Sequence, residues 1–437
     1  MQSFFFYCIV FVFPFFSLYL HKKDKTMRRI SFLLLGLSAL LSLHAQGLKV
    51  TVTNPSDFQR QQVVEISLQK VQQQMNIDAE APLCVKNALG QVVTSQITHD
   101  GKLLFEAAVH PHGLSEFTLE AISTPMKEGK SAFGFVAKTR KDDLSWENDR
   151  SSYRVYGPPL RRTGEKAYGV DVWTKSTPHL VNTDRYRIDH EGNIVKDSLR
   201  RMKKDDEWKT VNLATSFHLD HGDGLDCYGV GPSLGCGAPA LFLKNQLLMP
   251  WCYETVNILD NGPLRFTAEF VFGSANNESL STLLSSLSPI KQHRIISLDK
   301  GSNYNRCEVW YDEIPSEAAL AAGIVIHKAD TTSLMMTSSS ILYADPTDRP
   351  QELGTQLYVG VLFPDAVEST TFLHDPQGDI VGNAIGMKTY TAGQHFVYYF
   401  GSAWSAADVR SFREWQLRSE EYLEALKAPL KVTMIKE

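Results

Sequence analysis

The sequence predicts an all-β protein, in which a small N-terminal β-sandwich precedes a large antiparallel double-sheet sandwich with a C-terminal helix. Short runs of alternating apolar and polar residues recur along the chain, bounded by Gly, Pro, Asn and Asp. This period of two is typical of half-buried strands, and segments with helical spacing are scarce. A chain of 437 residues exceeds one ordinary hydrophobic core, so we expect two domains.

The predicted small sandwich covers residues 46–122. Its alternating runs come at the spacing expected of a β-sandwich: LKVTVTN (48–54), VVEISL (63–68), APLCVKN (81–87), GQVVTSQIT (90–98), KLLFEAAV (102–109) and SEFTLEA (115–121). The polar stretch STPMKEGKS (123–131) follows, and we interpret residues 123–144 as a linker.

The predicted large sandwich covers residues 145–437, where the alternating runs are longer. They are SSYRVYG, YGVDVWTK, TSFHLDH, RFTAEFVFG, HRIISLD, RCEVWYDE, GIVIHKAD, QLYVGVLFP and HFVYYFGSAW. A helix is predicted over Ala406–Leu426, opened by Ser405, because apolar residues recur there at helical spacing. Residues 274–288 are interpreted as either a short helix or a loop.

The N-terminus carries an export signal. Residues 27–45 have the charged start, apolar centre and small-residue cleavage site of a signal peptide, with Arg28 and Arg29 at its start. Residues 1–26 are either a misplaced translation start or an additional apolar segment that anchors the chain. No Cys follows the cleavage site after Ala45 closely enough for a lipid anchor. We therefore expect a periplasmic or secreted protein with no stable membrane anchor.

The charge balance limits the classes of partner. Removing residues 1–45 takes five Lys/Arg from 44 and one Asp from 49, which leaves a net charge of −9. A chain this acidic has no broad electrostatic footprint for nucleic acid or anionic lipid. It can bind an acidic glycan only through a local group of Arg and Lys. Five cysteines remain, and Cys227 and Cys236 either pair or are ordinary free thiols.

The stretch SWENDRSSYRVYGP gathers polar and aromatic side chains at a predicted strand. Its candidate sugar-binding residues are Trp146, Asn148, Arg150, Arg154 and Tyr156. A guanidinium binds a uronate carboxylate through two parallel hydrogen bonds, a geometry that Lys cannot copy. Arg150 and Arg154 are therefore candidates for binding an acidic sugar. The alternative is that they form structural pairs with Asp or Glu on neighbouring strands.

The run GVDVWTK places Asp171, Trp173 and Lys175 on one strand face. A carboxylate, an indole and an ammonium in a row are unlike a core layer. They suit a sugar ring, whose apolar face stacks on an indole while its hydroxyls form hydrogen bonds. The alternative is an ordinary exposed strand face with one half-buried Trp.

The glycine-rich stretch FHLDHGDGLDCYGVGPSLGCGAP ends the predicted strand TSFHLDH. Loops on a rigid sheet are where functional residues concentrate. His218 and His221 can act as base or acid near neutral pH, and Tyr228 can supply a phenol for proton transfer. Asp226 is a further candidate for substrate binding. The alternative is a polar turn whose histidines only satisfy local hydrogen bonds.

No metal or cofactor is expected. Four residues of this stretch are of types that can bind a metal: His218, Asp220, His221 and Asp223. Their spacing matches no zinc or calcium signature. The sequence contains no dinucleotide-binding fingerprint and no phosphate-binding loop. Nucleotide and kinase chemistry therefore have no support.

Two later strands also alternate polar and apolar residues: Arg306, Glu308, Trp310 and Asp312 on one, and Arg265, Thr267 and Glu269 on the other. Either a broad polar groove or ordinary solvent-facing strands explain both patterns. The remaining histidines of this part are interpreted as structural rather than catalytic: His293, His327, His374 and His395.

The segments WENDRSSYRVYGP, GVDVWTK and DHGDGLDCYGVGPSLGCGAPAL resemble those of a secreted Bacteroidota family, a domain-of-unknown-function group from polysaccharide-utilisation loci. The resemblance covers roughly Leu48–Leu430. It implies the galactose-mutarotase-like supersandwich fold and work on glycans, with an acidic oligosaccharide as the partner.

For such a substrate the resemblance implies β-elimination at a uronic acid. Arg150 or Arg154 would neutralise the carboxylate, His218 or His221 would remove the C5 proton, and Tyr228 would protonate the departing oxygen. A departing sugar makes the protein a carbon–oxygen lyase, and departing water makes it a dehydratase.

Two other functions stay open at this point. The same scaffold could serve an aldose epimerase or a glycoside hydrolase, with Glu269 or Glu308 as the carboxylate beside His218. Alternatively, the chain could be a non-catalytic glycan-binding protein, in which the histidines are structural.

Overall fold

A computed structural model describes residues 47–126, 129–273, 290–315, 317–328, 332–348 and 353–436. The predicted signal peptide, residues 1–26 and the helix or loop predicted at 274–288 lie outside these ranges. Within them, no helix combines the length and the apolar character needed to cross a membrane.

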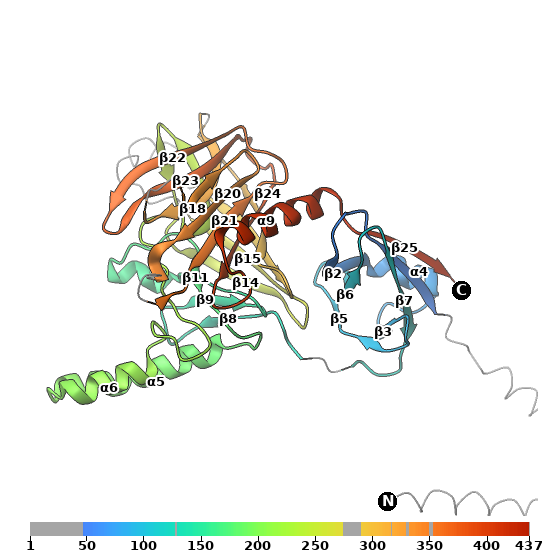
Figure 1. Cartoon of the computed structure of the whole chain (residues 1–437), viewed down its shortest axis with the longest axis horizontal. Coiled ribbons are helices and arrows are strands. Elements are labelled where there is room, and N and C mark those ends of the chain that lie inside the picture. Colours follow the sequence, from blue (N-terminus) through green and yellow to red (C-terminus); the bar gives the residue numbers. More distant parts are fainter. Residues whose placement is uncertain are drawn as a thin grey trace, which may run out of the picture. The chain divides into compact units, whose positions relative to one another are not determined.

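The N-terminal sandwich contains a five-stranded sheet, in the order β25-β1-β7-β3-β4, and a three-stranded sheet, in the order β2-β6-β5 (Figure 1). Val50, Phe105 and Leu119 lie in the core between them. The helix α4 was not predicted. The elements are β1 (Leu48–Thr53), β2 (Arg60–Ser67), α4 (Leu68–Met75), β3 (Leu83–Asn87), β4 (Val92–Val93), β5 (Ser95–Ile97), β6 (Lys102–Val109) and β7 (Leu114–Ala121).

The last strand of the chain completes this N-terminal sheet. β25 (Lys431–Lys436) runs antiparallel to β1, with Leu48 opposite Lys436 and Thr53 opposite Lys431. The predicted boundary that assigned residues 145–437 to the large sandwich is therefore wrong at its C-terminal end. No strand was predicted after the C-terminal helix, and a local pattern does not say which sheet edge a strand joins.

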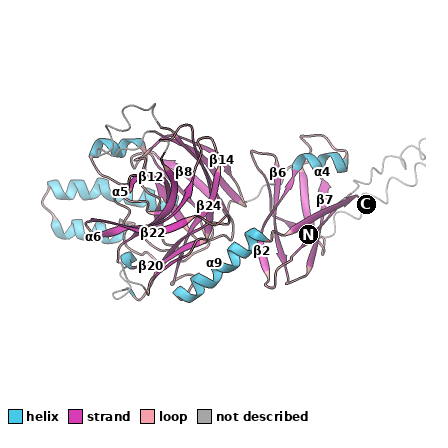
Figure 2. Cartoon of the chain, turned by 90° about the horizontal axis from the view of Figure 1, so that it is seen from above, coloured by secondary structure: helices cyan, strands magenta, loops and turns pink. Residues whose placement is uncertain are grey.

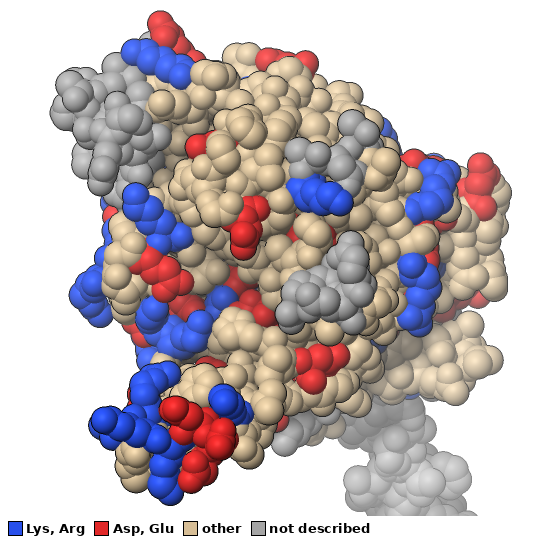
Figure 3. All heavy atoms as spheres, turned by 60° about the vertical axis from the view of Figure 1, so that its left-hand side comes forward, with Lys and Arg blue, Asp and Glu red and all other residues tan. Residues whose placement is uncertain are grey.

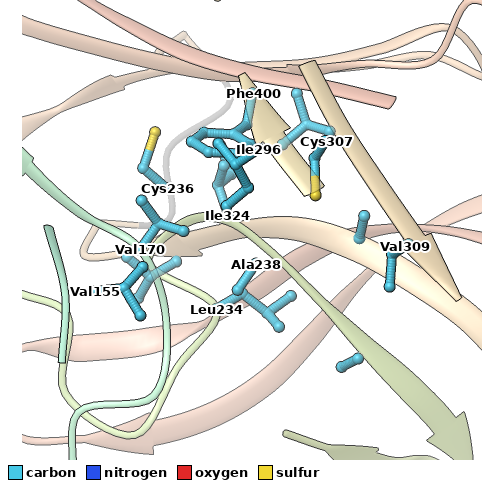
Figure 4. Packing of buried hydrophobic residues seen from close by; sticks show 14 of the residues in the cluster. Val155, Val170, Leu234, Cys236, Ala238, Ile296, Cys307, Val309, Ile324 and Phe400 are labelled. Carbon is cyan, nitrogen blue, oxygen red and sulfur yellow. The ribbon is translucent and has the colours of Figure 1, made fainter. Parts of the chain in front are cut away.

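The large sandwich consists of an eight-stranded sheet, in the order β14-β15-β16-β17-β24-β21-β20-β19, and a five-stranded sheet, in the order β13-β12-β18-β23-β22. Side chains from both sheets form one core, and Figure 4 shows Ile324 of the smaller sheet beside Phe400 of the larger. The antiparallel all-β prediction is confirmed, and strands dominate in Figure 2.

The strands of the five-stranded sheet are β12 (Cys236–Leu243), β13 (Gln246–Leu248), β18 (Ala319–Ile326), β22 (Ser369–Gln377) and β23 (Ile380–Thr389). Those of the eight-stranded sheet are β14 (Tyr253–Asn261), β15 (Arg265–Phe272), β16 (Gln292–Asp299), β17 (Tyr304–Tyr311), β19 (Leu334–Met336), β20 (Ser340–Asp345), β21 (Leu357–Leu362) and β24 (Phe396–Trp404).

A four-stranded sheet lies against β14 and β15. Its strands are β8 (Phe133–Ala137), β9 (Asp143–Glu147), β10 (Ser152–Val155) and β11 (Asp171–Trp173). Two of them begin inside the stretch interpreted as a linker, residues 123–144, so that interpretation is wrong. Trp146 of β9 stacks on Tyr153 and Phe266, with ring centroids 5.6 and 6.0 Å apart, and this aromatic contact joins the sheet to β15.

Two helices interrupt the β structure where the sequence predicted none: α5 (Asn182–Arg201) and α6 (Asp205–Thr215). Polar Arg185, Asp189 and Lys196 are buried on α5, while Ile194 and Val195 are exposed. Because polar residues are buried and apolar residues are exposed, α5 lacks the apolar stripe from which a helix is predicted. Lys and Arg lie beside Asp and Glu on the surface of this hairpin (Figure 3).

The strand predicted over TSFHLDH is wrong, because α6 ends at Thr215 and turns follow. The C-terminal helix is confirmed as α9 (Phe412–Lys427), although it starts later than expected. Ser411, not Ser405, caps it by accepting a hydrogen bond from the Glu414 backbone N–H. Two short 3₁₀ helices, η1 (Pro158–Thr163) and η3 (Pro346–Asp348), complete the described elements.

Candidate active site

Four predicted site residues meet in one buried group, the Arg154 cluster: Arg154, Tyr156, Asp171 and Asp226. Arg154 of β10 lies opposite Asp171 of β11. Its Nε donates to Asp171 Oδ2 over 2.8 Å, and its Nη2 donates to Asp226 Oδ2 over 3.1 Å. The Tyr156 hydroxyl also donates to Asp171 Oδ2, over 3.1 Å. The guanidinium is therefore held by two carboxylates rather than offered to a ligand.

The charges of this cluster depend on each other. Burial raises the pKa of Asp171 to about 7, against the opposing effect of Arg154 and with a further increase from Asp226. Burial alone would lower the pKa of Arg154, but Asp171 and Asp226 raise it well above its ordinary value. Arg154 therefore stays charged, and Asp171 is the partner whose raised pKa lies near neutral pH.

His218 connects this cluster to the surface. Its side chain is 58% exposed, and its Nδ1 lies 2.9 Å from the backbone oxygen of Asp226 and 3.6 Å from Oδ2 of the same residue. A carbonyl oxygen only accepts, so this hydrogen bond requires a hydrogen on Nδ1. In the neutral imidazole, Nε2 then carries the free lone pair. His218 is thus oriented as a base by a buried residue that Arg154 holds.

Arg140 and His218 contact the same aromatic ring. The Arg140 guanidinium carbon lies 4.8 Å over the Phe217 ring centroid, and the His218 ring lies 4.7 Å from it. The Arg140 side chain is 36% exposed, with Asp143 Oδ2 3.8 Å from its Nε. The sequence analysis missed Arg140, because it fell in the stretch interpreted as a linker. The basic pair Arg140 and Lys141 directly before a strand was the available signal.

The predicted exposed face of Asp171, Trp173 and Lys175 does not exist, because all three side chains are buried. Trp173 stacks on Tyr186 of α5 at 5.0 Å and packs on Phe217 at 4.6 Å. Its indole is therefore not free to hold a sugar ring. Alternation correctly predicts that these residues share a face, but helix α5 covers that face.

Lys175 supports the start of α5. Its Nζ donates to Glu147 Oε2 over 2.6 Å, and to the backbone oxygens of Asn148 and His179 over 2.6 and 2.7 Å. The other Glu147 oxygen accepts from the Asn182 backbone N–H over 2.7 Å. A carboxylate here satisfies free helix N–H groups and complements the helix dipole. Lys175 is therefore structural.

The other residues predicted in SWENDRSSYRVYGP are also occupied by the fold. Trp146 is fully buried, and its indole N–H donates to Asn305 over 2.8 Å. Asn148 closes a turn by accepting from the backbone N–H of Arg150. The Arg150 guanidinium donates to the Asp408 carboxylate at the surface. The expectation that Trp146, Asn148 and Arg150 face a sugar is therefore corrected, because each side chain already has its partner.

His221 and Tyr228 lie on the same glycine-rich stretch as His218, but their side chains have different contacts. The His221 Nε2 lies 2.9 Å from the Ser216 backbone oxygen and stabilises the turn after α6. Gly224 adopts a φ of +110°, and a Cβ there would meet the Thr174 backbone oxygen, so glycine is required for this close approach.

The Tyr228 hydroxyl is buried and has no hydrogen-bond partner among the described residues. Its ring packs edge-on against His327 at 5.6 Å. Burial, with a further contribution from Asp345, raises the pKa of Tyr228 well above its ordinary value. Such a phenol gives up its proton poorly, so the role of general acid does not suit it.

His327 and Asp345 form a buried ion pair that the sequence did not reveal. His327 Nδ1 lies 2.7 Å from Asp345 Oδ2, and Nε2 lies 2.6 Å from the Gly229 backbone oxygen. Both partners only accept, so both ring nitrogens donate and the imidazole is charged. Burial opposes this charge, but Asp345 raises the pKa of His327 above its ordinary value. The pair fixes the backbone beside Tyr228.

Asp220 and Asp223 have partners within the loop region. Asp220 accepts from the backbone N–H groups of Gly222 and Gly224, and Asp223 pairs with Arg185 at 3.2 Å. No group of three or more His, Cys, Asp or Glu side chains suited to a metal occurs in the described ranges. Cys227 and Cys236 do not pair with each other, because both are free thiols.

Glu308 and Glu269, the carboxylates considered for an epimerase or hydrolase, have other partners on the eight-stranded sheet. Glu308 lies 2.6 Å from Nδ1 of His395 and 2.8 Å from Arg306. Glu269 accepts from Asn257 over 3.4 Å. Neither contact involves His218.

Comparisons with known proteins identify relatives over nearly the whole chain. A family model described as "Domain of unknown function (DUF4861)" matches residues 52–432. A protein of Formosa agariphila, named "Uncharacterized protein P7", is 23% identical over 406 residues, covering 88% of this chain and 93% of that protein.

Two solved structures from Enterococcus faecalis resemble the chain at 10% identity and a TM-score of 0.47 each. One is an alpha-mannosidase, of which 46% is covered by 89% of this chain, and the other is a protein in the Glycosyl Hydrolase Family 38, of which 50% is covered by 91%. The chain spans about half the length of these two proteins.

Proposed function

The chain belongs to the DUF4861 family, and we propose that it acts on acidic oligosaccharides as a carbon–oxygen lyase or dehydratase. The observation that carries this proposal is the exposed His218 ring, whose Nδ1 lies 2.9 Å from the Asp226 backbone oxygen. An imidazole held in this tautomer presents a basic Nε2 to a substrate.

The reaction is a β-elimination at a uronic acid. His218 Nε2 removes the C5 proton, which is weakly acidic because it lies next to the carboxylate. The electron pair of that C–H bond forms the C4–C5 double bond while the C4–oxygen bond breaks. The imidazolium then returns its proton to the departing oxygen. One residue on one face of the sugar serves both steps, so the reaction does not need the buried Tyr228 hydroxyl.

Arg140 replaces Arg150 as the residue that binds the substrate carboxylate. Its half-exposed guanidinium lies over the Phe217 ring that also contacts His218. A planar guanidinium can hold a carboxylate through two hydrogen bonds and so stabilise the negative charge that develops during elimination. Arg154 keeps a positioning role, because it holds Asp226 behind the imidazole.

The remaining parts of the proposal concern substrate and location. The sequence segments that resemble proteins of polysaccharide-utilisation loci favour glycans, and the export signal favours the periplasm or the exterior. Terminal uronates would lose water, and internal linkages would lose a sugar. A single base beside a single cation serves both reactions, so the length of the bound oligosaccharide decides between them.

The test is incubation with uronate-bearing oligosaccharides, followed by ultraviolet absorbance of the new double bond and by mass spectrometry. We expect His218→Gln to lower the rate by roughly 10²–10⁴-fold, the usual contribution of a general base. His112→Gln changes an exposed histidine of the N-terminal sandwich and should leave the rate unchanged. Full activity in a folded His218→Gln protein would remove the assigned base.

The mass of the product separates the competing functions. A dehydratase lowers the substrate mass by one water, and a lyase splits the chain without adding water. A hydrolase adds one water and gives no ultraviolet signal, whereas a binding protein leaves the oligosaccharide unchanged. The last two outcomes contradict the proposed elimination.

A further inference from the structure

Arg294 is a buried cation with no carboxylate partner among the residues that the structure describes. It lies on β16, points between the two large sheets, and is only 1% exposed. Its guanidinium carbon lies 3.9 Å over the Phe272 ring centroid, and its Nε donates to Gln292 Oε1. Among the described residues, Nη1 and Nη2 are buried with no hydrogen-bond partner. Two charged donor groups are thus left unsatisfied.

A third donor lies beside them. Because Gln292 Oε1 accepts from Arg294, its amide nitrogen faces the other way and donates to the Tyr311 hydroxyl and to the Pro239 backbone oxygen. The Tyr311 oxygen therefore acts as an acceptor, and its own hydrogen remains available. Residues 292 and 311 are directly opposite each other on β16 and β17, so the arrangement is part of the sheet.

The surroundings of Arg294 do not balance its charge. Burial lowers the pKa of Arg294, and the groups that oppose this effect are Tyr398, Cys307 and Tyr311, none of which is a carboxylate. An unpaired charge in a protein interior costs several kcal/mol, and buried unsatisfied donors call for a bound ion or water. Arg154 shows the contrast, since two carboxylates contact it.

We infer that Arg294 and Tyr311 bind a small monovalent anion, chloride in chemical class, inside the large sandwich. One guanidinium balances one negative charge, and the near-complete burial of Arg294 beside the Phe272 ring favours a compact ion over a sugar acid. Chloride also sheds its water more readily than sulfate or phosphate does. This site is independent of the proposed reaction at His218, so either inference can fail without the other.

The first experiment compares unfolding of the purified protein in sodium chloride and in sodium gluconate at equal ionic strength. A ligand that binds only the folded state raises the unfolding midpoint with its concentration. We expect chloride to raise the midpoint of the natural protein and to have no such effect on Arg294→Met. Tyr311→Phe should require roughly tenfold more chloride, because it loses one hydrogen bond to a charged partner.

The matched control is Arg306→Met, which removes an arginine from β17 that is 38% exposed and paired with Glu308. This variant should keep the chloride dependence of the natural protein. Equal stability of the natural protein in chloride and gluconate would overturn the inference. So would a chloride response that survives in Arg294→Met.

A direct measurement covers the case in which Arg294→Met does not fold. Crystals of the natural protein soaked in sodium bromide should show anomalous scattering between the Arg294 Nη atoms and the Tyr311 hydroxyl. Anomalous peaks confined to the protein surface would contradict the site.

Discussion

Arg154 and Arg294 are both buried arginines of the large domain, yet their surroundings differ. Arg154 contacts Asp171 and Asp226, whereas Arg294 contacts an amide and an aromatic ring. The pKa of Arg154 is raised and that of Arg294 is lowered. The difference shows that burial alone does not identify the role of an arginine. A compensated guanidinium supports a neighbouring site, whereas the uncompensated Arg294 is where we infer a bound anion.

The largest effect on stability is expected from Arg154→Met. Removing the guanidinium leaves Asp171 and Asp226 buried together without their cation, and breaking such a group costs about 3–5 kcal/mol. Urea unfolding of the natural and variant proteins measures the change. A loss below about 1 kcal/mol would show that the two carboxylates do not depend on Arg154.

The second test is the pH dependence of stability. The folded-state pKa of Asp171 is raised to about 7, above its unfolded value, so the folded protein binds this proton more tightly. Stability contributed by the proton is present at low pH and falls as pH rises through 7. We expect a loss on the order of 2 kcal/mol between pH 5 and pH 8.

The control for this pH effect is Asp171→Asn, which carries no titrating carboxyl and should show a flatter profile over the same range. The quantity compared is the slope of unfolding free energy against pH, not the absolute stability. Identical slopes in the two proteins would contradict the raised pKa of Asp171.

A smaller effect is expected from Arg294→Met in chloride-free buffer. The variant replaces an uncompensated charge by an apolar side chain, which is often neutral or stabilising, so we expect no loss and a gain of about 1 kcal/mol. Unfolding in sodium gluconate measures it. A loss like that of Arg154→Met would mean that Arg294 has a protein partner after all.

The smallest effect is expected from Arg150→Met. Arg150 pairs with Asp408 at the surface, with 34% and 40% of the side chains exposed. Solvent screens such pairs, which contribute up to about 1 kcal/mol. Chemical unfolding again gives the value, and a loss as large as that of Arg154→Met would remove the distinction between exposed and buried guanidiniums.

Much of the β fold could be predicted, because apolar and polar residues alternate along a strand that has one buried face. The runs HRIISLD and HFVYYFGSAW became β16 and β24 for this reason. Helix α5 could not be predicted, since its apolar Ile194 and Val195 face outward. The pairing of β25 with β1 joins segments that lie almost 400 residues apart, with Leu48 opposite Lys436, and no local pattern encodes it.

The candidate site was predicted in part. The sequence brought Arg154, Asp171, Asp226 and His218 under consideration, and the structure links them by hydrogen bonds. It also suggested Trp173 and Lys175 as surface residues, because alternation tells which residues share a face but not what covers that face. Arg140 was missed, since its place over Phe217 depends on two segments far apart in the chain.

By itself, the sequence determined the antiparallel β architecture, the C-terminal helix and the residue types from which a site could be built. These are local properties, set by side-chain period and backbone preference. Only the tertiary structure decided which arginine is compensated, which histidine is exposed and which end of the chain completes the first sheet. Such outcomes depend on charges and strands brought together over long separations, where burial changes the free energy of each group.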